Sequence, residues 1–198
     1  MTRPWVLGLT GSIGMGKTTT AAMFAAEGIP VWDADAVVHH LYSPGQAAAV
    51  AIAARYPQAV GVDGRVDRAR LRAMIAADAS VMDWLNATVH PLTAADRARF
   101  LTDHGNTEIV LLDIPLLFES GADALCDAVV AVTAPPEVQR ARVLARGMTE
   151  DDFAMILARQ MPDAEKRARA THIIETISKD QTRAAVRALL RNLRASHA

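Results

Sequence analysis

The sequence contains almost no cysteine and no long apolar run. Cys126 is the only cysteine among 198 residues, so neither a disulfide within the chain nor a cluster of thiolate metal ligands can form. A single thiol is typical of a reducing compartment, and we expect a cytoplasmic protein. No apolar stretch approaches the roughly 20 residues that a membrane helix needs, and the short run after Arg3 is not a signal peptide.

The chain also lacks an excess of charge of either sign. It carries 21 lysines and arginines against 22 aspartates and glutamates, a net charge of -1. No broad basic surface for nucleic acid or membrane is indicated, so local arginines must hold any anionic ligand. Hydrophobic residues make up 51 % of the chain, which excludes a disordered protein. The length suits one domain with a sizeable core, and we expect a monomer.

What the sequence does have is a phosphate-binding loop near its N-terminus. Residues 11–18 read Gly-Ser-Ile-Gly-Met-Gly-Lys-Thr, the pattern G-x-x-x-x-G-K-[ST]. The apolar run 5–10 predicts a buried parallel strand before the loop, and 18–27 predicts a helix after it. Strand, glycine loop and helix together form an anion nest. Lys17 is expected to reach the β- and γ-phosphates of a nucleotide, and Thr18 to hold Mg²⁺.

Two aspartates follow the second predicted strand, which covers 29–32. Asp33 would lie at the carboxyl end of that strand, where open parallel sheets bind their ligands. A carboxylate there can accept the proton of an acceptor hydroxyl, so Asp33 is a candidate base; the alternative is a helix cap. Asp35 is either the cap of a helix over 36–42 or a substrate ligand.

The stretch from Asp35 to His104 has a helical pattern with polar breaks and no strand signal. We interpret about 35–104 as a helical insertion between strands two and three, and as the place of a second substrate. Pro91 is expected to open a new helix. Helices are predicted over 46–56, 67–77, 79–88 and 91–103, with a turn at Asp63-Gly64.

The second half of the chain returns to strands. The run 108–112 ends in Asp113 and resembles a Walker B strand, so Asp113 either touches Mg²⁺ through water or merely ends the strand. Further strands are predicted over 128–132 and 172–174. Helices are expected from Pro135 to about Arg146 and over 179–195.

Arginines are concentrated between Gln139 and Arg169, and we predict a lid over about 140–169. Arg142 and Arg146 are four residues apart and would share one helix face. Guanidinium groups bind phosphate oxygens through two parallel hydrogen bonds, although the same spacing also suits a solvated helix face. The elements together predict an α/β fold: a three-layer P-loop NTPase, in one domain over 1–198, with helices on both faces of a parallel sheet.

Several motifs beyond the loop resemble the dephospho-CoA kinase family, and the resemblance runs over nearly the whole chain. They are Thr10-Gly11 with the loop, Asp33-Ala34-Asp35 with His39, Asp63-Gly64-x-Val66-Asp67-Arg68-x-x-Leu71, His90-Pro91, Leu112-Asp113-Ile114-Pro115-Leu116-Leu117-Phe118-Glu119, Gln139-x-x-Arg142-x-x-x-Arg146 and Arg159-Gln160-Met161. The Ile-Pro-Leu-Leu-Phe-Glu run and the Asp-x-Asp after strand two are more specific than the loop alone.

The resemblance implies a kinase that moves the γ-phosphate of ATP, with Mg²⁺, to the 3′-hydroxyl of the ribose of dephospho-CoA. It implies Asp33 as base, Arg142 and Arg146 as lid arginines, and the helical insertion around the acceptor. The residues implied around the phosphates are Gly11, Gly14, Met15, Gly16, Lys17, Thr18 and Thr19, and those implied around the acceptor are Asp35, His39, Arg68 and His90.

Two positions depart from the family pattern. Met15 stands where a small residue is usual, which we expect to be tolerated because that position contributes backbone N–H groups. Residues 174–178 read Ile-Glu-Thr-Ile-Ser and lack the usual Asn and Gly, a difference that bears on the contact with adenine and not on the chemistry.

Two other functions compete with this interpretation. A GTP-driven switch would need Asp-x-x-Gly after strand three, but the chain has Asp113-Ile-Pro-Leu, and it also lacks the Asn-Lys-x-Asp that reads guanine. A P-loop kinase for shikimate or a nucleoside monophosphate would share the fold and the ATP site and differ in the insertion. The residues alone leave that second alternative open, because a fold does not define a substrate.

Overall fold

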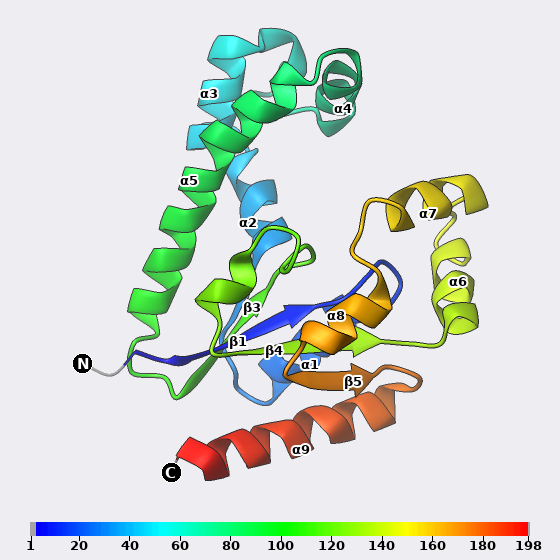
Figure 1. The fold of residues 1–198 in the computed structure, drawn as a ribbon. Coiled ribbons are helices and arrows are strands. Elements are labelled where there is room, and N and C mark those ends of the chain that lie inside the picture. Colours follow the sequence, from blue (N-terminus) through cyan, green and yellow to red (C-terminus); the bar gives the residue numbers. More distant parts are fainter. Residues whose placement is uncertain (1–2, 198) are drawn as a thin grey trace. The chain divides into compact units, whose positions relative to one another are not determined.

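Five strands form the centre of the computed structural model, which describes residues 3–197 (Figure 1). The sheet order is β2-β3-β1-β4-β5, and the pairs β1–β3, β1–β4 and β4–β5 are parallel. The strands are β1 (Trp5–Thr10), β2 (Val31–Asp33), β3 (Ile109–Asp113), β4 (Ala128–Thr133) and β5 (His172–Glu175). These bounds lie within about two residues of the predicted ones, and the α/β class with a parallel sheet is confirmed.

The chain divides into two compact units. One consists of the segment up to Trp32 together with the segment from His104 onward, and the other is Asp33–Asp103. Each unit has its own cluster of buried apolar side chains. The sheet and the glycine loop belong to the first unit, and the second unit is helical.

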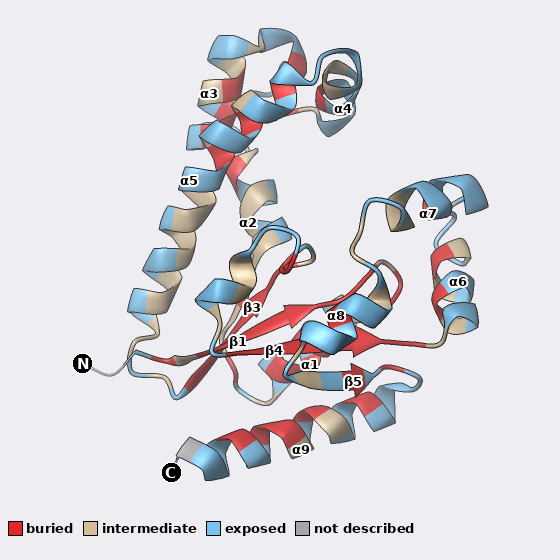
Figure 2. Ribbon diagram, in the orientation of Figure 1, coloured by how far each residue is buried: buried red, intermediate tan, exposed pale blue. Residues whose placement is uncertain are grey.

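Burial explains why the central strands of the first unit read as unbroken apolar runs. Every residue of β3 and β4 is buried, as are five of the six residues of β1, as Figure 2 shows. A strand covered on both faces has no solvent side on which polar residues could alternate. Phe24 and Leu190 pack against one face of these strands. The helices of this unit are α1 (Lys17–Ala26), α6 (Pro136–Leu144), α7 (Glu150–Leu157), α8 (Asp163–Arg169) and α9 (Lys179–His197), with a 3₁₀ turn at Ala122–Leu125.

The second unit is a group of helices around a separate core. Ile52 is fully buried there, and Leu71, Leu85 and Val89 pack in the same cluster. Its elements are α2 (Ala34–Leu41), α3 (Ala47–Arg55), a 3₁₀ turn at Pro57–Ala59, α4 (Arg68–Ala77) and α5 (Ser80–Asp103). The predicted Asp-Gly turn is present. Gly64, at a φ of 78°, lies in the loop between Val60 and Val66, which are joined by a single antiparallel bridge.

The prediction that Pro91 opens a new helix was wrong. The helix α5 runs without a break from Ser80 to Asp103 and holds Pro91 in its interior. A proline there removes one backbone hydrogen bond and costs about 3 kcal/mol. The buried side chains of Leu85 and Val89 in the turns before it offset that cost, because packing of an apolar face outweighs local propensity.

Among the described helices, none combines the length and apolar character that a membrane crossing requires.

The independent core of the second unit leads to a stability prediction. Replacing Ile52, which is 0 % exposed, by Ala should lower the free energy of unfolding by about 2–5 kcal/mol, because the lost side chain leaves a cavity. Urea denaturation measures this loss, and amide hydrogen exchange should accelerate mainly within 33–103. Val50→Ala is the control, since Val50 lies on the same helix and is 57 % exposed. A loss as small as that of the control would contradict the assignment of this core.

Candidate active site

The glycine loop between β1 and α1 can be built only with glycine at two of its positions. Gly14 and Gly16 have φ angles of 77° and 86°, in the left-handed region. A Cβ on Gly14 would lie 2.7 Å from Cγ2 of Val143, and one on Gly16 would lie 2.9 Å from Oγ1 of Thr176. The loop is therefore pressed against α6 on one side and the end of β5 on the other.

Two other loop residues face the core. A Cβ on Gly11 would lie 2.4 Å from Cγ2 of Val132. Met15 is 3 % exposed, and its sulfur accepts a hydrogen bond from the Ala134 N–H at 3.0 Å. The Met15 side chain fills a space below the loop, but its backbone N–H donates to the Ser12 carbonyl at 3.1 Å and, contrary to expectation, is not free for a ligand.

The N-terminus of α1 is open to an anion. Its cap is Gly16, which offers no side chain, and no acidic residue stands in the first turn. The first N–H groups of a helix have no partner within it, and the helix dipole adds partial positive charge there. Thr18 and Thr19 occupy this turn and are exposed. The arrangement can bind a phosphate group.

Lys17 and Asp113 are in direct contact. The Lys17 Nζ lies 2.6 Å from Oδ1 of Asp113, and the two side chains are 14 % and 2 % exposed. Asp113 ends β3, which pairs with β1, so the sheet itself brings this carboxylate to the loop. The structure therefore brings together the predicted nucleotide lysine and one of the two predicted metal ligands.

Arg142 is partly buried and contacts both the glycine loop and the residues that follow β5. Its guanidinium donates to the carbonyl and the hydroxyl of Thr176, and at 3.4 Å to the carbonyl of Gly14. The prediction that Arg146 shares its helix face was wrong, because α6 ends at Leu144 and Arg146 lies in the following turn. Gly147, at a φ of 83°, closes that turn. The side chain of Arg146 is exposed and pairs with no other group in the described part of the chain.

The helix α7 begins with a side-chain cap. The hydroxyl of Thr149 accepts from the Asp152 N–H at 3.1 Å and caps the helix. Arg140 of α6 forms an ion pair with Glu150 of α7. The two helices are therefore tied to each other near the turn that separates them.

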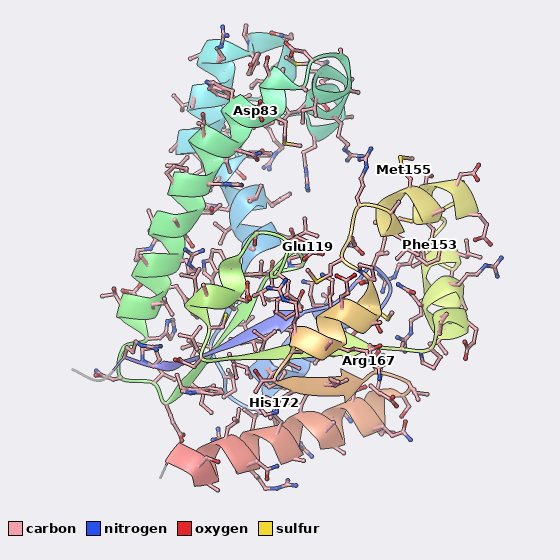
Figure 3. The ribbon with its side chains drawn as sticks, viewed as in Figure 1. Asp83, Glu119, Phe153, Met155, Arg167 and His172 are labelled. Carbon is pink, nitrogen blue, oxygen red and sulfur yellow. The ribbon has the colours of Figure 1, made fainter. Side chains whose placement is uncertain are left out.

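The helix α8, which follows α7, carries a buried lysine that the sequence analysis did not identify. Lys166 of α8 is 0 % exposed, and its Nζ lies 2.7 Å from Oε1 of Glu119. The Met161 N–H donates to the same oxygen at 2.9 Å; Figure 3 labels Glu119 on the segment that follows β3. Burial alone would raise the pKa of Glu119, but these hydrogen bonds and the lysine charge outweigh it and leave the pKa below its usual value.

Asp33 is the last residue of β2 and the cap of α2. Its Oδ1 accepts from the Ala36 N–H at 3.0 Å. The helix therefore begins two residues earlier than predicted, and the suggestion that Asp35 is the cap was wrong. Asp35 lies exposed in the first turn of α2. The cap role of Asp33 uses one of its two carboxylate oxygens.

The helical unit contains a pocket of about 270 Å³. Two of the predicted substrate residues, Arg68 and His90, line it, while His39 and Asp35 lie elsewhere on α2. Tyr42 also lines it; burial raises the pKa of the tyrosine hydroxyl, and the Arg68 charge offsets part of that rise. A pocket with cationic groups on apolar walls suits a ligand that carries phosphate on a longer, less polar arm.

Only two metal ligands, Thr18 and Asp113, are predicted for this site. Within residues 3–197 no group of three or more His, Cys, Asp or Glu side chains could hold a metal ion. The hydroxyl of Thr18 and the carboxylate of Asp113 nevertheless fit Mg²⁺, which takes oxygen ligands and is commonly bound through one or two protein groups together with substrate phosphates and water.

Comparison with known proteins gives consistent matches. Residues 5–181 match the family described as Dephospho-CoA kinase. The dephospho-CoA kinase of Cereibacter sphaeroides is 63 % identical over 193 residues, which is 97 % of each chain. The crystal structure of TT1252 from Thermus thermophilus has a TM-score of 0.80 at 33 % identity, covering 97 % of this chain and 99 % of that one.

A second solved structure supports the fold alone. The dephospho-CoA kinase from Campylobacter jejuni has a TM-score of 0.67 at 19 % identity and covers 95 % of this chain and 96 % of its own.

The pKa of Glu119 predicts how stability changes with pH. Because the folded pKa lies below the ordinary 4.5, the charged Glu119 stabilises the fold above that value, and the contribution is lost as pH falls through the folded pKa. Glu119→Gln should lower the free energy of unfolding by about 1.5–3 kcal/mol at pH 7, the scale of a hydrogen bond to a charged group. The difference from the unchanged protein should shrink below pH 4.5 in urea titrations. Glu165→Gln, on the exposed side of α8, is the control; a pH-independent difference for Glu119→Gln would contradict the assignment.

Proposed function

Because the chain belongs to the dephospho-CoA kinase family, we propose how its residues carry out the transfer of the ATP γ-phosphate to the 3′-hydroxyl of the dephospho-CoA ribose. This ATP-dependent reaction is the final step of coenzyme A synthesis. The observation that carries the proposal is the open N-terminus of α1 with Lys17 held beside it by Asp113. Phosphoryl transfer needs positioned positive charge more than covalent chemistry, and this group supplies it.

We propose that ATP phosphates lie in the loop over residues 14–19, against its backbone N–H groups other than that of Met15, which donates to the Ser12 carbonyl. Lys17 would then leave Asp113 for the β- and γ-phosphate oxygens, exchanging one anion for another. The ammonium would be paired with an anion both before and after this exchange. The charge of Lys17 stabilises the transition state as negative charge builds on the transferred group and the leaving oxygen.

Thr18 and Asp113 would hold Mg²⁺, the hydroxyl directly and the carboxylate through water. A bound Mg²⁺ supplies neutralisation of the charge shared by the β- and γ-phosphates. Asp113 becomes available for this role when Lys17 turns toward the phosphates. The two proposed roles of the buried carboxylate therefore follow one another.

Asp33 would be the base. Its position at the carboxyl end of β2 suits a ligand contact, and the oxygen that does not cap α2 can accept the proton of the 3′-hydroxyl. The cap also fixes the direction of the carboxylate, since the Ala36 N–H holds the other oxygen. A base restrained in this way loses little freedom when the acceptor arrives.

The helical unit would bind the acceptor. Arg68 and His90 line its pocket and can donate to phosphate oxygens, and Asp35 and His39 would contact the nucleotide head. This supports the domain interpretation of the sequence: one P-loop kinase with an acceptor-binding insertion. The presence of a separate core means that the pocket walls do not depend on the sheet for their packing.

Arg142 and Arg146 would serve the lid in different ways. Arg142 is held by Thr176 and Gly14 and would add charge from a fixed place. Arg146 lies exposed in a turn of the predicted lid (about 140–169) and could approach the phosphates when the part of the lid around α7 closes. We further propose that the protein is a cytoplasmic monomer, on the grounds of its single cysteine and balanced charge.

The choice of acceptor tests the function. In a coupled assay of ADP release, dephospho-CoA should exceed AMP, adenosine and shikimate in kcat/KM by several orders of magnitude. The reason is that polar groups left unpaired by a smaller acceptor cost binding free energy in the transition state. Equal turnover of AMP would leave a general nucleotide kinase, and turnover of shikimate alone would reverse the assignment.

A substitution tests the base. Asp33→Asn keeps the shape and an oxygen for the α2 cap but removes the proton acceptor, so kcat should fall by roughly 10²–10⁴. ATP affinity, measured by calorimetry, should stay close to normal. Asp83→Asn, an exposed carboxylate of α5, is the control. Loss of ATP binding with unchanged kcat would instead make Asp33 a ligand of the nucleotide or its metal.

A further inference from the structure

We propose that Gln139 and Gln160 are positioning residues. By hydrogen bonding to the carbonyl and the N–H of Ile13, they hold the phosphate-binding loop in the conformation that binds phosphate. The inference rests on the nucleotide role proposed above for the loop. It concerns two residues outside the loop and outside the phosphate contacts. Each acts on the ligand only through the backbone it restrains.

The contacts are direct. The Gln139 Nε2 donates to the Ile13 carbonyl at 2.7 Å, and the Gln160 Oε1 accepts from the Ile13 N–H at 3.0 Å. Gln139 is 6 % exposed, and Gln160 is half-buried. Both hydrogen-bonding groups of one backbone residue are thus satisfied by side chains, without a contribution from a helix or strand.

The two glutamines lie on either side of α7 in the sequence. Gln139 lies in α6, one turn before Arg142, and Gln160 follows the end of α7. The neighbouring Met161 N–H is itself fixed to Glu119, so the base of the segment is held at two adjacent residues. The segment between the two glutamines is therefore attached to the loop at both of its ends, through the same residue, Ile13.

The loop needs such restraint because of its glycines. Gly14 and Gly16 lack a Cβ and reach many backbone conformations, of which the nest uses one. Ordering a residue on binding costs conformational entropy, and a loop already ordered binds more tightly. The contact of α6 with Gly14, where a Cβ would meet the Gln139 carbonyl at 3.0 Å, restrains the same region.

Neutral amides suit this task better than charged side chains. A carboxylate beside the loop would oppose the phosphates of ATP, and a lysine could compete with Lys17 for them. An amide donates or accepts without adding net charge to the field of the site. The Ile13 N–H is engaged by Gln160, so its role is to hold the loop and not to bind phosphate.

A double-mutant cycle tests the proposal on the whole protein. Gln139→Met, Gln160→Met and the double variant keep side-chain length and remove the hydrogen bonds, and ATP binding is measured by calorimetry without acceptor. Each single change should weaken ATP binding by about 5–30-fold, the scale of ordering one residue. The double variant should be little weaker than either single one, because freeing one side of Ile13 already releases the loop.

Further readouts separate positioning from a purely structural role. The Ile13 amide should exchange its hydrogen faster in each variant, and KM for dephospho-CoA should change by less than about twofold. Gln181→Met, an exposed glutamine on α9, is the control. Unchanged ATP affinity, or effects in the double variant that simply multiply, would overturn the proposal. Failure of the unchanged protein to bind ATP or to phosphorylate dephospho-CoA would instead overturn the proposed function.

Discussion

The ion pair between Lys17 and Asp113 is the interaction on which the site depends. It joins the first residue of α1 to the last residue of β3, and the carboxylate is almost completely buried. An uncompensated charge at such a place is strongly destabilising, and the ion pair with Lys17 opposes that penalty. The parallel pairing of β1 with β3 sets the distance between them, and the buried apolar strands in turn keep that pairing in register. The chemistry therefore rests on the packing of the sheet.

The sequence predicted the features that depend on local patterns. Buried runs bounded by Gly or Pro located the strands, and the glycine loop between a strand and a helix located the phosphate site. Pro91 was misjudged because the continuity of α5 depends on side chains packed against Leu85 and Val89, which no local rule includes. The prediction for Arg146 failed because residues four apart share a face only if both lie in the same helix, and α6 ends at Leu144.

The contacts that the sequence could not predict join residues far apart in the chain. Gln139 and Gln160 lie 126 and 147 residues from the Ile13 they bind, and Lys166 lies 47 residues from Glu119. Nothing in the spacing of these residues indicates their partners. Lys166 in particular has the sequence setting of an exposed helical lysine, with charged neighbours on both sides, and is nevertheless fully buried. Burial of a lysine follows from the partner that the fold supplies.

Met15 shows how closely recognition and the hydrophobic core are joined in this chain. Its main chain belongs to the loop, while its side chain fills core volume beside β4 and accepts a hydrogen bond from the Ala134 N–H. The side chain of Met15 therefore serves packing, whereas that of Lys17, two residues later, lies beside Asp113 in the candidate site. A substitution at this position must fit the space below the loop, and it removes the hydrogen bond from the Ala134 N–H unless the new side chain can accept it. A substitution of Met15 that changes the side-chain volume by even one methylene would shift the backbone of the loop, because the core is close-packed. Substitutions in the core can therefore alter the phosphate site without changing any residue that faces it.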